Sequence, residues 1–191
     1  MRLVSSLRHC FLALSLGALL ASAPAFAATV VNTNITEADV KAAQDGWGKA
    51  LIQISDDFAS GGIAKAKATA NQVLDAAYGY NLGLVLFKPT LTHSDQTFRT
   101  TKAGALAYFV GDDRAFPSDK GFALGGWKKY EYRNAGVFIT GNMALTMGKV
   151  ILTDKDGKVT TVDKTWGFKK DSQGQLRIVL HHSSLPFQPS K

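Results

Sequence analysis

Cysteine is almost absent from this sequence. Its 191 residues contain one, Cys10, inside a stretch that has the pattern of a secretory signal peptide. That stretch, Met1–Ala27, has a basic start, a short apolar core and the small-residue end Ala25-Phe26-Ala27 at which a signal peptidase cleaves. The expected mature chain therefore begins at Ala28 and has no cysteine. This excludes disulfides, thiolate metal ligands and a cysteine nucleophile.

The sequence also lacks a long hydrophobic run and a run of basic residues. The apolar core at 10–20 is too short to span a membrane, so we expect a periplasmic or secreted protein with no membrane attachment after cleavage. Loss of Arg2 and Arg8 leaves 20 basic against 15 acidic residues, a net charge of +5 that mildly favours anionic ligands. The lysines are scattered without interleaved aromatic residues, so no nucleic-acid partner is predicted.

Histidines are few, and only His93, His181 and His182 follow the expected cleavage site. Adjacent residues of a strand point to opposite faces, so His181 and His182 cannot both join one site. A catalytic zinc site needs about three protein ligands. No H-x-H or H-E-x-x-H spacing, G-x-S-x-G elbow, P-loop or Rossmann glycine pattern occurs. The sequence predicts no metal site and no cofactor, although a spatial Ser-His-Asp triad stays open.

Two amphipathic helices are expected in the first half of the chain. Thr36 and Asp39 have the spacing of a capping box, and apolar residues recur at helical spacing from Val40 to Phe58. Gly61-Gly62 should end this helix, and a second helix is expected over Ile63–Tyr78. Their Ala-rich faces allow close packing on a sheet.

The middle of the chain is more varied. Leu82–Phe87 is a near-continuous apolar run, which predicts a strand buried on both faces. Lys88-Pro89-Thr90 closes it, and a polar loop with His93 follows. Lys102–Val110 is interpreted as a short helix. The segment Gly111–Gly126 predicts a long loop, a feature that often covers or binds a ligand in compact domains.

From Trp127 onward the sequence indicates an antiparallel meander of four strands joined by turns, over Lys129–Thr140, Ala144–Thr153, Lys158–Lys169 and Gln175–Ser184. Helices followed by a meander indicate an α+β fold and a single domain over 28–191. The helices would pack on one face of a curved sheet and enclose a cone-shaped pocket. The outer face, with residues such as Trp166 or Phe168, would be covered in a homodimer.

The last strand carries polar residues before Pro186 stops the ladder. Alternation places His181 and Ser183 on one face and His182 and Ser184 on the other. A pocket lined by Thr90, Tyr108, His181 and Ser183 could hold a small oxyanion or a polar carbonyl through preorganised hydrogen bonds. The alternative is that these are ordinary satisfied polar groups, or a strand end that runs into solvent.

Several segments of the sequence together resemble the iota-class carbonic anhydrases, most closely the branch that works without metal. They are Leu86-Phe-Lys-Pro-Thr90, Gly104-Ala-Leu-Ala-Tyr-Phe-Val-Gly111, Lys120-Gly-Phe-Ala-Leu124, Asn134-Ala-Gly136, Ala144-Leu-Thr-Met-Gly148 and Leu180-His-His-Ser-Ser-Leu-Pro186. That family is similar in turn to the NTF2-like fold and to the association domain of calcium/calmodulin-dependent kinase II.

The resemblance implies a cone-like α+β domain that forms a homodimer and hydrates CO2 reversibly. It would place Thr90, Tyr108 and Ser183 around bound bicarbonate, with His181 beside them. Two positions differ from the family patterns. Gly125-Gly126-Trp127 replaces a frequent Lys-Pro-Trp, and Leu180 stands where the metal-using branch has the first of three consecutive histidines.

In the implied mechanism, apolar side chains receive CO2 while the hydroxyls orient water and stabilise charge on the product oxygens. No residue is assigned as the proton acceptor, because a tyrosine with an ordinary pKa of about 10 is a poor base at neutral pH. Two alternatives remain: a non-catalytic ligand-binding or assembly module, and an isomerase or cyclase acting on a small hydrophobic substrate. An isomerase or cyclase would need a buried Asp or Glu as its base.

Overall fold

The computed structural model describes residues 32–189. The signal peptide expected at Met1–Ala27 lies outside these residues and stays a prediction. Among the residues described, no helix combines the length and the apolar character that a membrane crossing needs.

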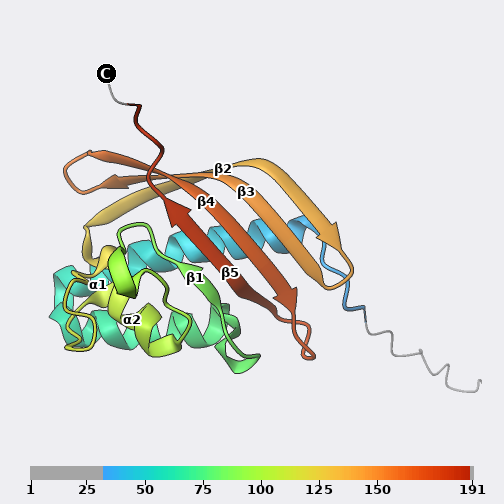
Figure 1. The fold of residues 1–191 in the computed structure, drawn as a ribbon, viewed down its shortest axis with the longest axis horizontal. Helices are drawn as coiled ribbons and strands as arrows, with labels where there is room; N and C mark the ends of the chain where they lie inside the picture. Colours follow the sequence, from blue (N-terminus) through green and yellow to red (C-terminus); the bar gives the residue numbers. More distant parts are fainter. Residues whose placement is uncertain (1–31, 190–191) are drawn as a thin grey trace, which may run out of the picture. The chain divides into compact units, whose positions relative to one another are not determined.

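Helix α1, Glu37–Ala77, consists of two arms joined at Gly62. The backbone of Gly62 has φ 68° and ψ −165°, which a side chain would strain, and the two arms run in opposite directions (Figure 1). They correspond to the two predicted helices. The predicted capping box is confirmed: the Thr36 hydroxyl accepts from the Asp39 amide at 3.1 Å, and the Asp39 carboxylate accepts from the Thr36 amide at 2.9 Å.

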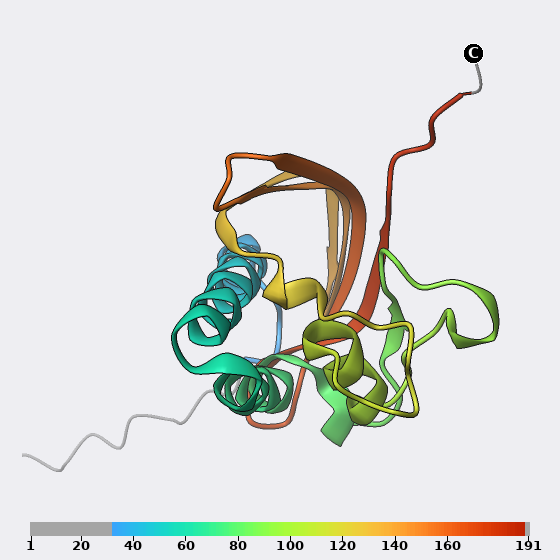
Figure 2. The ribbon, with the colours of Figure 1, turned by 90° about the vertical axis from the view of Figure 1, so that its left-hand side faces the viewer.

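Five strands form one sheet in the order β1-β5-β4-β3-β2. The predicted meander is confirmed as β2 (Trp127–Thr140), β3 (Met143–Asp154), β4 (Val159–Lys170) and β5 (Leu176–Ser184), each antiparallel to the next. The short strand β1, Leu86–Lys88, adds to the edge of β5 in parallel, so the sheet is mixed. Figure 2 shows the sheet curving over α1 and α2. The predicted α+β architecture, with helices on a curved sheet, is confirmed.

The prediction of a strand buried on both faces at Leu82–Phe87 was wrong. Only the three residues of β1 are extended in the sheet, and the residues around them alternate in exposure. Val85 and Phe87 are buried, whereas Leu84 and Leu86 are exposed. The reason is that β1 is an edge strand with only its inner face covered by helices.

Helix α2, Lys102–Val110, confirms the predicted short helix. Its N-cap Thr101 accepts from the Gly104 amide at 3.2 Å, and Gly111 ends it with φ 63°. The loop at 111–126 follows and contains the 3₁₀ turn η3, Phe122–Leu124. Two more 3₁₀ turns, η1 (Gly79–Asn81) and η2 (Ser94–Gln96), flank β1.

The core lies between the inner face of the sheet and the helices. Trp166 and Phe168 were expected on the outer face, and this was wrong: both are buried on the inner face. Val162, Trp166 and Phe168 are separated by even numbers of residues along β4, so their side chains lie on the same face, which packs on α1. The Trp166 ring lies 5.7 Å from the ring of Trp47.

Candidate active site

The two faces of β5 differ as the alternation predicted. His181 and Ser183 are buried on the inner face, at 2% and 1% exposure, while His182 is exposed and Ser184 is partly exposed on the other face. The His181 imidazole and the Ser183 hydroxyl therefore point from the inner face of β5 into the core.

Strand β1 brings Thr90 to Ser183. Because β1 and β5 are parallel, with Lys88 opposite His182, both strands end at the same edge of the sheet. Thr90 follows β1 directly, and its hydroxyl donates to the Ser183 hydroxyl at 2.7 Å. Lys88 Nζ also donates to the Ser183 carbonyl at 3.1 Å. Two residues that lie 93 positions apart in the sequence thus form one hydroxyl pair.

Tyr108 on α2 presents a buried hydroxyl beside this pair. Its ring packs edge-on against Phe87 at 5.7 Å and stacks on Phe122 at 5.5 Å. Within residues 32–189 the hydroxyl has no hydrogen-bond partner. Burial raises the pKa of Tyr108 well above its ordinary value. Weak polar contacts with Thr90 and with the backbone of Leu91, too poorly aligned to count as hydrogen bonds, partly offset this. Tyr108 is therefore a protonated, unoccupied donor.

Thr90 and Tyr108 line a pocket of about 380 Å³. One part of its wall is apolar, and another part carries polar and charged groups. The remaining lining residues are Leu91, Phe122, Trp127 and Leu185 among the apolar ones, and Ser118, Asp119, Lys120 and Thr160 among the polar ones, with Gly121 and Gly125. Such a wall suits a ligand that is apolar in one state and anionic in another.

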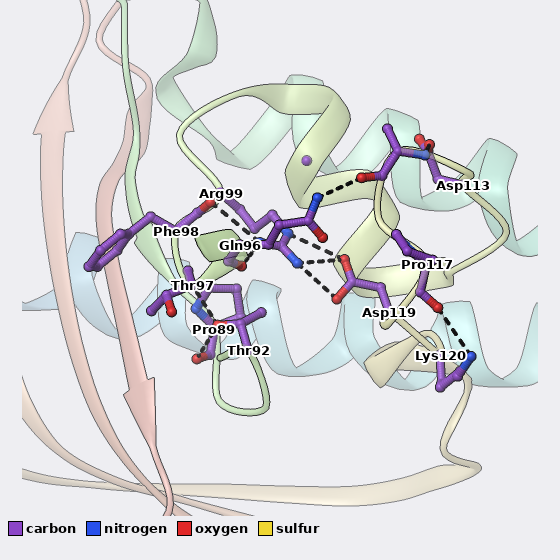
Figure 3. Close-up of polar contacts among 12 residues, drawn as sticks. Pro89, Thr92, Gln96, Thr97, Phe98, Arg99, Asp113, Pro117, Asp119 and Lys120 are labelled. Carbon is purple, nitrogen blue, oxygen red and sulfur yellow. Dashed lines mark hydrogen bonds and ion pairs between the residues drawn. The ribbon is translucent and has the colours of Figure 1, made fainter. Parts of the chain in front are cut away.

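The long loop is held against this pocket by a buried ion pair (Figure 3). Arg99, at 1% exposure, donates to both carboxylate oxygens of Asp119 at 3.0–3.2 Å and to the Gln96 carbonyl. Its guanidinium also lies 4.6 Å from the ring of Phe116. Gln96 donates in turn to the Ala115 carbonyl at 2.7 Å. These contacts fix the loop that contributes residues 118–121 to the pocket wall.

His181 lies behind the pocket rather than in its wall. Its ring stacks on Phe87 at 4.3 Å, Nδ1 lies 2.8 Å from the Tyr78 hydroxyl, and Nε2 lies 2.6 Å from Lys164 Nζ. Burial, with a further contribution from Lys164, lowers the pKa of His181 well below its ordinary value, so the imidazole is neutral. The structure therefore places Thr90 and Tyr108 in the pocket wall and Ser183 behind Thr90, to which it is hydrogen-bonded. His181 lies deeper, beside Tyr78 and Lys164.

Sequence reasoning missed four residues around the site: Tyr78, Arg99, Asp119 and Lys164. Only Lys164 had a usable signal. It occupies an inward position of β4 between Val162 and Trp166, where an unpaired lysine is unexpected. Arg99 and Asp119 lie in loops whose pairing the sequence pattern does not encode.

Within the described part of the chain, no group of three or more His, Cys, Asp or Glu side chains lies close enough together to hold a metal ion.

Comparison with known proteins decides the family. The family model described as metal-independent carbonic anhydrase matches residues 38–185. This chain belongs to the metal-independent carbonic anhydrase family. A metal-independent carbonic anhydrase from Nostoc sp. (strain PCC 7120) is 64% identical over 159 residues, covering 83% of this chain and 78% of the relative.

One solved structure agrees with this assignment. The crystal structure of a cyanobacterial iota-carbonic anhydrase complexed with bicarbonate matches with a TM-score of 0.84 and 62% identity, covering 86% of this chain and all of that one. An NTF2-like protein of unknown function from Pseudomonas putida matches with a TM-score of 0.47 and 12% identity, over 81% of this chain and 91% of that one. The iota-class resemblance is confirmed: the chain is a carbonic anhydrase, which hydrates CO2 reversibly to bicarbonate.

Proposed function

We propose that this carbonic anhydrase interconverts CO2 and bicarbonate in the pocket beside Thr90, Tyr108 and Ser183. The observation that supports this most strongly is the buried Tyr108 hydroxyl, which has no hydrogen-bond partner in the described residues. A buried polar group left unpaired costs about 1–3 kcal/mol. An oxygen of bicarbonate, or of the attacking water, would relieve that cost.

The pocket supplies both environments that the reaction needs. The apolar wall near Phe122 and Trp127 accepts CO2. The hydroxyls of Thr90, Tyr108 and Ser183 orient a water molecule and donate to the oxygens on which negative charge develops. The bicarbonate bound to the 62% identical cyanobacterial enzyme supports this choice of ligand.

The two alternatives raised by the sequence have less support. A binding or assembly module is disfavoured by membership of an enzyme family. An isomerase would need a free buried carboxylate, and Asp119, the one carboxylate in the described lining of this pocket, is paired with Arg99.

A CO2-hydration assay with metal control tests the proposal. Stopped-flow measurement with a pH indicator should give a rate far above that of buffer alone. We also propose that this activity needs no metal, so exhaustive chelation should leave the rate unchanged, with substoichiometric metal by elemental analysis. Activity that vanished on chelation and returned with zinc or manganese would overturn metal independence but not the reaction.

We further propose a homodimer that buries the outer face of the sheet. Apolar side chains are exposed at one end of this face: Leu86, Phe138, Leu145 and Met147, of which Met147 is 63% exposed. They surround Gly167, where an added Cβ would lie 2.9 Å from Leu180 and 3.3 Å from Leu145. A contiguous apolar surface of this kind is typical of an interaction site.

The dimer has a direct test in solution. Light scattering at micromolar concentration should give twice the monomer mass, and Met147→Glu should shift the protein to the monomer because it places a charge in the apolar contact. Val159→Glu is the matched control, since Val159 is an exposed apolar residue of β4 at the other end of the sheet. A native chain that is monomeric at this concentration would refute the proposal.

Export stays a proposal as well, supported by the pattern at Met1–Ala27. Protein isolated from the periplasm should have the intact mass of a chain that begins at Ala28, and uncleaved protein retained in the cytoplasm would contradict export.

A further inference from the structure

Lys164 is a buried lysine without a counter-ion among the described residues. Its exposure is 4%, and its Nζ lies 4.6 Å from the ring centre of Trp47 and 5.4 Å from that of Trp166. None of the ion pairs formed among residues 32–189 includes it. Its polar contact in this region is His181 Nε2 at 2.6 Å. The two indole rings stabilise an ammonium through cation–π contacts, but burial without a counter-ion still disfavours the charged form.

The hydrogen bonds around His181 lead to the same protonation state. Trp47 Nε1 donates to the Tyr78 oxygen at 3.1 Å, which leaves Tyr78 free to donate its own proton to His181 Nδ1 at 2.8 Å. A neutral imidazole that accepts at Nδ1 carries its proton on Nε2. The acceptor for that proton is Lys164 Nζ, which needs an amine lone pair to receive it.

The reverse arrangement leaves more donors unpaired. If Lys164 were an ammonium that donates to Nε2, His181 would donate from Nδ1 to Tyr78. The Tyr78 proton and two ammonium protons would then lack acceptors among the described residues, three donors against the two amine protons left unpaired in the first arrangement. Buried donors without acceptors are rare in proteins, so the arrangement with a neutral amine is favoured.

Lys164 also lies next to the proposed reaction site. It is opposite Ser183 in the register of β4 and β5, and both point to the inner face. Side chains at directly opposite positions have Cβ atoms about 4.5–5.5 Å apart. The Ser183 hydroxyl accepts from Thr90, and no described residue accepts its own proton. One hydroxyl, that of Ser183, therefore lies between Thr90 in the pocket wall and the Lys164 side chain.

We propose that the Lys164 amine, held by His181, takes up the proton released when water adds to CO2 in the pocket. The O–H bond of water breaks as its oxygen bonds to carbon, and CO2 becomes bicarbonate. The Nζ lone pair gives up its hydrogen bond from His181 Nε2 and takes the proton, which forms the third N–H bond of an ammonium. Buffer later removes that proton. This inference rests on the proposed pocket. Lys164 acts through Ser183 and is a positioning and proton-holding residue, with no substrate contact assigned to it.

The groups that face Lys164 allow one added proton and no more. On β5, His181 has its pKa lowered by burial and then by Lys164, so it does not accept a second proton near neutrality. At the end of α1, burial raises the pKa of Tyr78, so this phenol stays protonated. On the other face of β5, burial and then Lys88 and Lys164 lower the pKa of His182, so this imidazole is largely neutral near pH 7, while Lys88 on β1 adds positive charge near it. Burial alone lowers the pKa of Lys164 to about 7, which suits a group that must both take and release a proton.

The first experiment uses the unaltered protein. NMR of ¹³C-labelled lysine should show the Lys164 Cε signal titrating near neutral pH, and saturating bicarbonate should move its midpoint upward because the anion stabilises the ammonium. Bicarbonate that binds without moving this midpoint overturns the proton-holding role and leaves the proposed function intact. Absence of both bicarbonate binding and hydration activity overturns the proposed function itself.

The second experiment removes the amine. Lys164→Met should lower kcat for CO2 hydration by roughly 10²-fold. It should also abolish the inflection near neutral pH that we expect in the pH dependence of kcat of the unaltered protein. The control is Lys149→Met, which removes an exposed lysine paired with Asp163 on the outer face and should leave rate and pH profile unchanged. A Lys164→Met variant with native kcat and a native pH profile overturns the proposal.

Stability provides a readout that does not depend on turnover. On unfolding, Lys164 returns from a pKa of about 7 to its ordinary 10.5, so the unfolded chain binds more protons between these values. Its contribution therefore makes stability rise with pH across this window. Melting curves of Lys164→Met should lose that rise relative to Lys149→Met, and should show no loss of stability at or below pH 7. A variant that keeps the full rise shows that Lys164 is charged in the native protein and overturns the proposal.

Discussion

Ser183→Ala should lower the rate of CO2 hydration by roughly 10²-fold, the usual effect of deleting one donor aimed at developing charge. The hydroxyl accepts from Thr90 at 2.7 Å and keeps a proton that no described residue accepts. Its removal takes away both the donor and the anchor of Thr90. Stopped-flow hydration measurements with thermal melts in parallel separate lost chemistry from lost folding.

Ser184→Ala is the matched control, because it deletes the same atom from the opposite face of the same strand. It should leave the rate within a few-fold of the native value. Tyr108→Phe adds a second signature: the rate should fall as for Ser183→Ala, while stability should not fall, because the lost hydroxyl is unpaired in the described residues. Equal effects of the two serine variants would show that the pocket has been assigned to the wrong face.

Arg99→Met should destabilise the protein by roughly 3–5 kcal/mol, since it leaves the Asp119 carboxylate buried without its partner. For a domain of this size that corresponds to a fall in Tm on the order of 10 °C. The rate should fall too, because the loop held by this pair forms one wall of the pocket. Calorimetry and hydration assays measure the two effects.

Two companion variants make the Arg99 result specific. Lys102→Met breaks the exposed pair with Asp75 and should change stability by less than about 1 kcal/mol. Replacing Arg99 and Asp119 together by Met and Leu should recover much of the stability lost in the single variant, because no charge is then left unpaired. A single variant as stable as the native chain would mean that the pair does not anchor the loop.

The elements of the fold were predictable where local signals agree. Thr36 and Asp39 set the start of α1, Gly62 its kink, and strand alternation separated Ser183 from Ser184. The prediction that Trp166 lies on the outer face was wrong, because strand alternation shows which residues share a face but not which face the helices cover. That choice is made by tertiary packing, here by contact with Trp47.

The candidate site was predictable only in part. Thr90, Tyr108 and Ser183 were named from their residue types and the family resemblance. The structure places Thr90 and Tyr108 in one pocket wall and pairs Thr90 with Ser183. The placement of His181 behind the pocket, with Lys164 and Tyr78 on its two nitrogens, depends on contacts across the fold that no local pattern encodes. The ion pair between Arg99 and Asp119 could not be predicted from the sequence for the same reason.

The parallel pairing of β1 with β5 also determines how late in synthesis the protein can complete its fold. β5 is the last strand to leave the ribosome, so Thr90 must wait for nearly the whole chain before it can meet Ser183, 93 residues later. Closing a loop of that length is slow, and until it closes the edge of β4 stays open to other chains. CO2 hydration therefore reports completed folding, and a truncated or stalled chain that lacks β5 can have helices and a partial sheet without any activity.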